Sequence, residues 1–332
     1  MSQVSTAPCP VCSATTATIA YPVDDLVLHG EGSWTFARCA CGHGVLAPQP
    51  SEEELTAFYS QLYTPENLEV MRKANESGFD QGLRRTRVAA VQAALGDQRA
   101  ERILDIGCGL GHFLTELAQA LGVSSAQGVE LGDPAADATE ARLAGALGAS
   151  SVPRVIRKPF DTVSLPEPVD VVSMNHFLEH HPRPRAALAQ AAALVRDGGL
   201  VEVEVPRGDG WGIRWLRRWW WPHLPPQHLH LFTRDGLDRA LRDVGLEPVS
   251  WSVSGYPMTL TAAWVHRVQH TLGRRSPFQG NPVMAAVSWL VGLPGLLATF
   301  AFDLTAGAVL NRTQGDILMV VARKVSAPSS PP

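Results

Sequence analysis

Three glycines alternate with other residues near the start of the central third of the chain, at positions 107, 109 and 111. An apolar run at 103–106 precedes them and a helix-like apolar pattern begins at Phe113, so the stretch predicts a strand, a tight turn and a helix. Glycine adopts positive φ and lets a ligand approach the backbone without a Cβ in the way. The N-terminus of the following helix offers unpaired N–H groups to an anionic or polar ligand. The stretch therefore predicts a ligand site at Gly107, Gly109 and Gly111.

Two carboxylates stand near this loop. Asp105 directly precedes the glycines, and Glu130 ends a second strand-like run at 126–130. In nucleotide-binding βαβ units, an acid about 20 residues after the loop holds the ribose hydroxyls. The loop reads G-x-G-x-G, however, where a dinucleotide fold prefers G-x-G-x-x-G. The motif by itself leaves open an ordinary turn that binds NAD or no ligand at all.

The run LDIGCGLGHF at 104–113, followed by GVE at 128–130, resembles the cofactor motifs of class I S-adenosylmethionine-dependent methyltransferases. The resemblance implies that the glycines make room for the cofactor, that Asp105 supports the loop and the methionine amine, and that Glu130 holds the ribose. It also implies that Phe160 packs on the adenine. The residues that the resemblance assigns to the cofactor are Asp105, Gly107, Gly109, Gly111, Glu130, Phe160 and Asn175.

Four cysteines form two close pairs, Cys9 with Cys12 and Cys39 with Cys41. Paired thiolates on two turns suit a tetrahedral zinc ion, which would supply folding energy to a segment too small to bury much core. The second pair is C-x-C instead of C-x-x-C, so His43 could replace Cys39 or Cys41 as a ligand. The alternative is a decayed ribbon or cysteines that meet by chance. If zinc binds, we expect it to be structural, because four protein ligands leave no open position.

A zinc ribbon followed by PQPSEEELTAFYSQLY at 48–63 resembles a subgroup of bacterial methyltransferases that act on sugars, lipids and other small metabolites. The resemblance implies that Tyr59 and Tyr63 lie over the cofactor. Packing of both rings in the core is the alternative. Ser51 and Glu54 match a capping box at the start of this helix.

Histidines cluster after the predicted fourth strand, at 169–174. The segment NHFLEHHP at 175–182 resembles the "LEH" segment of the same methyltransferases, and it should lie at the carboxyl end of the sheet. If the acceptor must lose a proton, His176, His180 or His228 could take it, because histidine titrates near neutral pH. A divalent cation held by an acid and a histidine is an alternative. The H-x-x-E-H spacing also matches an inverted zinc-protease pattern, which we reject because it needs a helix and a further ligand.

The expected fold is α/β: a seven-stranded, mostly parallel Rossmann-like sheet with an antiparallel last strand, preceded by a zinc ribbon and helices. Valines alternate with Glu202 and Glu204 in the fifth strand, at 200–205, so one face of that strand is polar or meets an arginine. The predicted parts are a zinc-ribbon-like module (1–47), a helical cofactor cover (48–98), a methyltransferase core (99–255), an apolar helical insertion (256–312), the last core strand (313–324) and a disordered tail (325–332).

Two stretches suggest an apolar acceptor side. Residues 211–221 read WGIRWLRRWWW, and residues 283–302 are nearly all apolar. Tryptophan and arginine together suit a membrane interface or a phosphate-bearing apolar substrate. We reject a single membrane span for 283–302, because Pro294-Gly295 interrupts it and a crossing would separate the last strand from its sheet. The remaining interpretations are peripheral membrane contact and a hydrophobic lid over the acceptor.

Composition limits the other classes. The chain has 332 residues and a net charge of −4, which argues against a broad nucleic-acid surface. The N-terminus lacks the basic and apolar regions of a signal peptide, so we expect a cytoplasmic protein, with peripheral contact at the inner membrane face as an option. Methyl transfer from S-adenosylmethionine to a small-molecule, sugar or lipid-linked acceptor is the leading interpretation. The rivals are an RNA methyltransferase that uses the zinc ribbon for recognition and a non-catalytic cofactor-binding scaffold.

Overall fold

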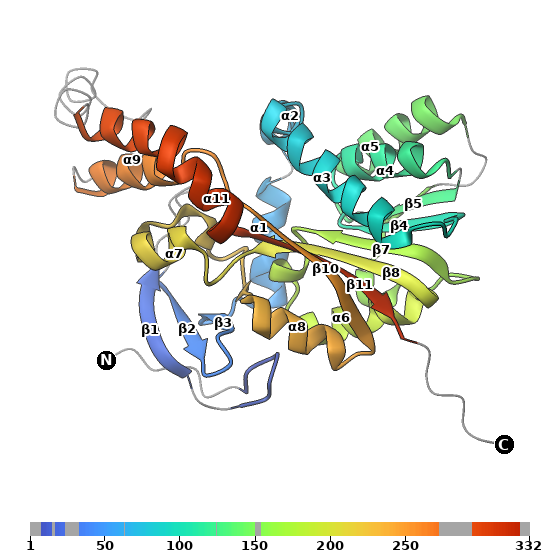
Figure 1. Ribbon diagram of the computed structural model, residues 1–332, viewed down its shortest axis with the longest axis horizontal. Coiled ribbons are helices and arrows are strands. Elements are labelled where there is room, and N and C mark those ends of the chain that lie inside the picture. The colour runs from blue at the N-terminus through green and yellow to red at the C-terminus, as the bar shows by residue number, and fades with distance from the viewer. Residues whose placement is uncertain are drawn as a thin grey trace. The chain divides into compact units, whose positions relative to one another are not determined.

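The computed structural model describes residues 8–14, 17–23, 33–62, 64–123, 125–149, 154–271 and 294–325. Figure 1 labels the helices and strands along the chain. The chain divides into two compact units. Unit 1 comprises Met1–Pro50, Pro206–Gly236 and Val253–Leu318, and unit 2 comprises Ser51–Val205, Leu237–Ser252 and Met319–Pro332. Both units are discontinuous in sequence.

A seven-stranded sheet forms the centre of unit 2, with the order β10-β11-β8-β7-β4-β5-β6. Its neighbours β4 and β5, β5 and β6, β4 and β7, and β7 and β8 are parallel. The strand order reverses beside β4, and at such a switch point the carboxyl ends of parallel strands leave room for a ligand. The predicted Rossmann-like fold is confirmed. The strands are β4 (Arg102–Ile106), β5 (Ser125–Val129), β6 (Val155–Ile156), β7 (Val169–Asn175), β8 (Val195–Pro206), β10 (Leu246–Ser254) and β11 (Ile317–Lys324).

Helices cover the sheet through apolar stripes. Leu114 and Leu117 of α4 are fully buried, together with Leu143 of α5 and Val91 of α3. Burial of aliphatic side chains of this size stabilises by about 1.5–3 kcal/mol each, which is why the β-α-β order closes into one core. The helices are α1 (Glu52–Leu62), α2 (Pro65–Asn75), α3 (Gly78–Leu95), α4 (His112–Leu121), α5 (Asp133–Leu147), α6 (Pro184–Leu194) and α8 (Arg234–Arg242).

Two local predictions have clear outcomes. The capping box is present, because the Ser51 N–H donates to Glu54 Oε2 at 2.7 Å and the Glu54 N–H donates to Ser51 Oγ at 3.1 Å. The start of the fifth strand was predicted wrongly. Strand β8 begins at Val195, directly after α6, and not at residue 200.

Unit 1 contains a four-stranded sheet with the order β1-β2-β3-β9. The strands β1 (Ala17–Val23), β2 (Trp34–Cys39) and β3 (Gly44–Ala47) form an antiparallel meander. Strand β9 (His230–Leu231) pairs antiparallel with β3, with Gly44 opposite Leu231. The N-terminal segment therefore shares its sheet with residues almost 190 positions later, whereas the sequence predicted a separate module.

The Trp-rich stretch and the insertion complete unit 1. Residues 211–223 form α7 (Trp211–Leu216) and two 3₁₀ turns, and α9 spans Thr259–Thr271. Residues 294–302 are helical and continue as a π-helical turn (Asp303–Gly307) and α11 (Ala308–Gln314). Most of the predicted apolar stretch 283–302 lies outside the described residues. Within the part of the chain that the structure describes, no helix is both long enough and apolar enough to cross a membrane.

Candidate functional site

The glycine loop joins β4 to α4, and each of its three glycines has positive φ. A Cβ added at Gly107 would lie 2.9 Å from a ring carbon of Phe177, and one at Gly111 would lie 2.7 Å from Thr139 Cγ2. At Gly109, an added Cβ would meet nothing within 4 Å. Packing therefore explains Gly107 and Gly111, and only Gly109 faces open space of the kind that a bound ligand would use.

Glu130 follows β5 and is 6% exposed. Its Oε2 accepts a hydrogen bond from the Gly109 N–H at 3.0 Å, and its Oε1 accepts one from the Gly132 N–H at 2.8 Å. The carboxylate thus fixes the middle of the glycine loop.

Asp105 is 3% exposed and accepts a hydrogen bond from Ser173 Oγ at 2.7 Å. Burial raises the pKa of Asp105 to about 7, against the lowering effect of the Ser173 hydrogen bond. Since a nearby cation would favour the ionised form, this acid suits an ammonium ligand such as the methionine amine.

The predicted adenine contact, Phe160, lies in a short 3₁₀ turn and is 4% exposed. Its ring meets Phe177 edge to face, with centroids 5.7 Å apart. Because Phe177 in turn packs over Gly107, the three residues form one contact chain beside the loop. Asn175 is the last residue of β7, opposite Glu204 of β8.

His176 lies between two buried carboxylates. Its Nδ1 is 3.0 Å from Glu179 Oε1 and its Nε2 is 3.1 Å from Glu204 Oε1. Arg87 of α3 also pairs with Glu204. Burial opposes the charged imidazole, but the hydrogen bonds that it donates to Glu179 and Glu204 raise the pKa of His176 to about 9. The imidazole therefore stays protonated at neutral pH, which disfavours its predicted role as a general base.

The polar face predicted for the fifth strand is present. Burial and the neighbouring Glu204 raise the pKa of Glu202 to about 8, so this side chain stays protonated. Glu204 is equally buried, and burial opposes its ionisation, but Arg87 and His176 lower its pKa to about 2. Two carboxyls two residues apart on one strand thus hold opposite protonation states, because only one of them pairs with cations.

His180 follows in the 3₁₀ turn Leu178–His180 and is partly exposed. Its Nδ1 lies 3.0 Å from the hydroxyl of Tyr59, and its Nε2 lies 3.9 Å from Glu179 Oε1. Because His176 lies between strand β7 and the 3₁₀ turn that His180 ends, the H-x-x-E-H residues do not share the helix that a zinc protease needs. Tyr63 lies outside the described residues.

His228 belongs to unit 1, where it is 5% exposed and its Nδ1 lies 2.7 Å from the Pro222 carbonyl oxygen. Thr233 nearby precedes α8, and its Oγ1 accepts a hydrogen bond from the Gly236 N–H at 3.1 Å.

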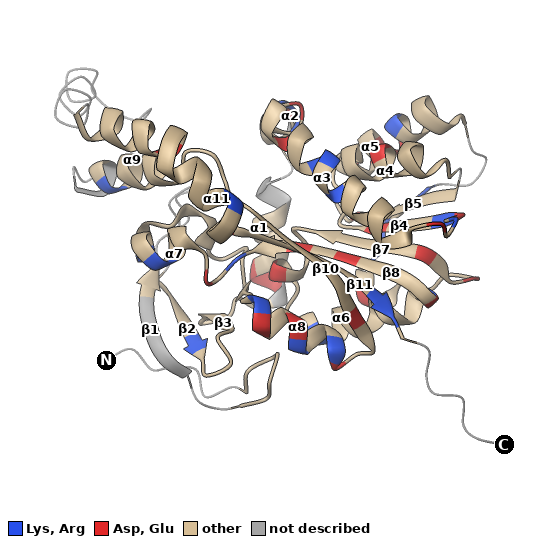
Figure 2. Cartoon of the chain, viewed as in Figure 1, with Lys and Arg blue, Asp and Glu red and all other residues tan. Residues whose placement is uncertain are grey.

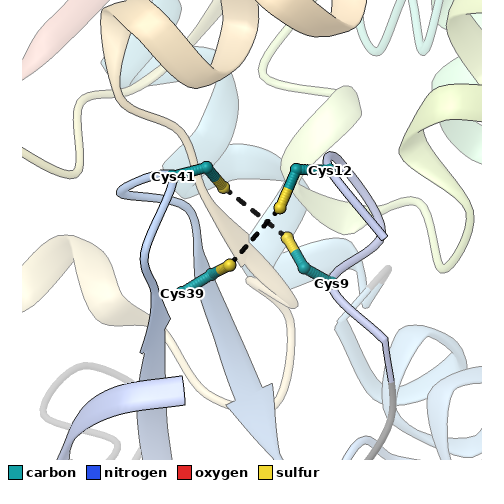
Figure 3. A group of neighbouring side chains, drawn as sticks. All are labelled: Cys9, Cys12, Cys39 and Cys41. Atoms are coloured by element: carbon teal, nitrogen blue, oxygen red, sulfur yellow. Dashed lines mark hydrogen bonds between the residues drawn. The ribbon is translucent and has the colours of Figure 1, made fainter. Parts of the chain in front are cut away.

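The four cysteines of unit 1 converge (Figure 3). Cys9 Sγ lies 3.7 Å from Cys41 Sγ, and Cys12 Sγ lies 3.4 Å from Cys39 Sγ. All four sulfur atoms lie within 4.8 Å of one another, and none of the four is in a disulfide. A tetrahedral zinc ion with Zn–S bonds of about 2.3 Å separates its sulfur ligands by roughly 3.8 Å. The thiol set therefore fits zinc in both chemistry and size.

His43 does not join this group. It is fully buried, and its Nε2 lies 3.2 Å from His230 Nδ1, with the two rings stacked 5.2 Å apart. Burial, together with His230 and Arg38, lowers the pKa of His43 well below its usual value. The alternative in which His43 replaces a cysteine is therefore wrong, because both Cys39 and Cys41 reach the cluster.

Sequence reasoning missed three residues of the site region. Thr139 donates to the Gly109 carbonyl at 2.7 Å, Phe177 covers Gly107, and Arg87 pairs with Glu204. Only Arg87 had a signal, because the alternating glutamates of β8 predicted a cation without saying which one.

The comparisons with known proteins agree with this geometry. A family model described as a methyltransferase domain matches residues 79–250, which is more than half of the chain. A ubiquinone biosynthesis O-methyltransferase of Bordetella bronchiseptica is 28% identical over 172 residues, covering 50% of this chain and 65% of that protein. One of Neisseria meningitidis with the same name is 33% identical over 107 residues, covering 32% of this chain and 44% of that protein. The chain thus matches less than two thirds of the length of either relative.

Solved structures show the same fold at low identity. The 1,6-didemethyltoxoflavin-N1-methyltransferase of Burkholderia thailandensis, solved with 1,6-didemethyltoxoflavin and S-adenosylhomocysteine bound, has a TM-score of 0.50 at 18% identity, covering 88% of this chain and 96% of that one. The [4+2]-cyclase SpnF has a TM-score of 0.50 at 16% identity, covering 84% and 99%. The family match confirms the predicted resemblance: this chain belongs to the methyltransferase-domain family.

Proposed function

We propose that the protein transfers the methyl group of S-adenosylmethionine to a small-molecule acceptor, through an oxygen atom of that acceptor. The observation that carries the proposal is the glycine loop fixed by Glu130, with open space at Gly109. The names of the two curated relatives support an oxygen acceptor of small size. Sugar and lipid-linked molecules belong to the same proposed class.

The cofactor supplies an electrophilic methyl group on a sulfonium centre. The protein's part is to hold donor and acceptor in line and to exclude water. Glu130 is proposed to accept the ribose hydroxyls, and Asp105 to face the methionine amine. Phe160 is proposed to pack on the adenine, and Asn175 to face the same site from the end of β7.

His180 is our preferred general base. We propose the tautomer in which Nδ1 carries the proton, directed at the Tyr59 oxygen, and Nε2 takes the proton of the acceptor. His176 is the weaker candidate, because two carboxylates keep it protonated. His228 stays a candidate on residue type alone.

The neighbouring His181 offers a matched control. Its Nε2 lies 3.2 Å from Asp161 Oδ1, so His181→Gln removes an imidazole from the same segment without touching His180. We expect His180→Gln to lower kcat by about 10²-fold, the scale of general-base catalysis, with little change in KM. It should also remove the acidic limb of the pH–rate profile. Equal kcat losses in both variants would contradict the assignment.

We also propose that the four cysteines of unit 1 hold one structural zinc ion. The converging thiols support it, since four thiolate ligands leave no open position for catalysis.

The proposed activity is tested with the full-length protein, methyl-labelled S-adenosylmethionine, and separate metabolite, lipid and RNA extracts. We expect label in a small molecule of the metabolite or lipid extract. Label that appears only in RNA would favour recognition of RNA by the zinc ribbon. Cofactor binding without label in any extract would favour a non-catalytic scaffold.

A further inference from the structure

Unit 1 exposes an apolar helix face. Leu297, Leu304 and Val309 are 60%, 60% and 64% exposed, and Phe300 is 42% exposed. Trp215 of α7 extends this face. The residue is 60% exposed, and its ring centroid lies 6.1 Å from that of Phe302, which belongs to the helix of Leu297 and Phe300. These five residues, here called the apolar helix face, are more than half of the large apolar side chains that are strongly exposed among the described residues.

The opposite side of this helix is firmly anchored in unit 1. Asp303 is buried and accepts hydrogen bonds from the N–H groups of Leu260 and Thr261 at 3.1 and 2.8 Å, which caps α9. Trp211 donates to Asn311 Oδ1 at 2.8 Å. Because the polar contacts and the buried indole hold one side, the apolar residues on the other side are presented to the surroundings as a fixed surface.

The charge around the apolar helix face has one sign. Arg214, Arg217, Arg267 and Arg312 are exposed on α7, the turn after it, α9 and α11. Arg312 lies one turn beyond Val309, and Arg267 lies one turn beyond Trp264, whose ring packs against Gly295 at the start of the helix. Among the described residues 211–222, 253–271 and 294–314, Asp303 is the only acidic residue, and it is buried where it caps α9. Figure 2 colours the acidic and basic residues along these helices.

We propose that the apolar helix face docks on an anionic membrane surface. Leucine, phenylalanine and tryptophan side chains enter the boundary between headgroups and acyl chains, and the surrounding arginines meet lipid phosphates. A second copy of this chain fits poorly, because it would bring the same arginines against one another without an exposed acid from these helices. The proposal assigns the membrane contact predicted at 211–221 and 283–302 to these particular residues. It does not depend on the proposed methyl transfer.

Vesicle flotation of the full-length protein tests the proposal. We expect binding to vesicles of phosphatidylcholine with phosphatidylglycerol, and at least tenfold weaker binding to phosphatidylcholine alone. Leu297→Ser/Leu304→Ser should lose at least tenfold in binding to the anionic vesicles. Arg214→Glu/Arg312→Glu should lose a similar factor, since each basic residue near an anionic surface contributes severalfold.

Matched controls come from unit 2. Val70 is 66% exposed on α2 and Arg85 is exposed on α3, so Val70→Ser and Arg85→Glu change the same residue types and should bind as the wild type does. Wild-type protein that floats with neither vesicle would overturn the proposal. So would a wild-type dimer that Leu297→Ser/Leu304→Ser converts to a monomer without any vesicle binding, since the face would then belong to a second copy.

Discussion

The glycine-loop region of unit 2 and the cysteine cluster of unit 1 bury their reactive groups in different ways. In unit 2, two buried acids have partners within the chain: Glu130 accepts hydrogen bonds from backbone N–H groups, and Glu204 pairs with Arg87 and His176. In unit 1, four thiols face one another at distances that suit a metal ion. A site completed by its own residues can fold before its ligand arrives, whereas a site of converging thiols depends on a metal for its stability.

The largest effect should come from removing one zinc ligand. We expect full-length Cys9→Ser to lose about one zinc per chain and most of the stability of β1 to β3, because structural zinc contributes of order 10 kcal/mol in small domains. Elemental analysis and amide hydrogen exchange would measure both. Exchange should rise at 34–47 and stay slow at 102–129.

Cys108 provides the control for this experiment. It is buried near Thr139 in unit 2 and is not one of the four clustered cysteines, so the Cys108→Ser protein should keep its zinc. Fully occupied zinc and unchanged exchange in Cys9→Ser would refute the metal site and remove the contrast between the two regions.

A smaller effect should follow from removing the cation between Glu179 and Glu204. We expect His176→Gln to destabilise unit 2 by about 2–4 kcal/mol at neutral pH, somewhat below the usual cost for a fully buried pair because the imidazole is 33% exposed. The pKa of His176 is raised in the folded state to about 9, above the ordinary value of 6.5. Its stabilisation is therefore complete below about pH 6.5 and is lost as the pH rises through 9.

Denaturant unfolding of the wild type and His176→Gln at pH 6 and pH 10 would measure this dependence. The difference in free energy of unfolding should shrink at the higher pH, and His181→Gln should not show that trend. A difference that is the same at both pH values would mean that the imidazole is not held as a cation.

The smallest effect concerns Glu202, whose pKa is raised to about 8 by burial. Between about pH 4.5 and 8 the unfolded chain releases a proton that the folded protein keeps, so stability falls as the pH rises. Glu202→Gln mimics the protonated form and should escape that loss. We expect its free energy of unfolding to rise relative to that of the wild type as the pH increases from 5 to 8.

The exposed Glu53 serves as the control, because Glu53→Gln should change nothing over this range. If Glu202→Gln instead loses stability relative to the wild type as the pH rises, Glu202 is ionised in the folded protein and the account of the buried acids in β8 fails.

Local motifs made one part of the molecule predictable from sequence. The strand, glycine loop and helix at 102–121 form a contiguous pattern, and the capping box at Ser51 is equally local. The family match and the seven-stranded sheet follow from the same contiguous patterns. The cysteines were also identifiable, because each pair is close in sequence.

The remaining features depend on partners far apart in the chain. Arg87 and Glu204 are 117 positions apart, and His43 and His230 are 187 apart. The type and local spacing of a residue do not indicate which distant side chain it contacts in the folded protein. For the same reason the sequence did not show that β9 completes the N-terminal sheet, or that Trp220 is fully buried while Trp215 is 60% exposed.

Calorimetric titration of the full-length protein with S-adenosylhomocysteine and with NAD tests the central claim most directly. We expect S-adenosylhomocysteine to bind and NAD not to bind. Glu130→Gln should weaken the binding by about 1–3 kcal/mol, the scale of hydrogen bonds to a charged group. Glu140 of α5 is the control acid, because it accepts a hydrogen bond from the Val155 N–H. Glu140→Gln should leave the affinity unchanged. Tight binding of NAD without binding of S-adenosylhomocysteine, or an unchanged affinity in Glu130→Gln, would contradict the account.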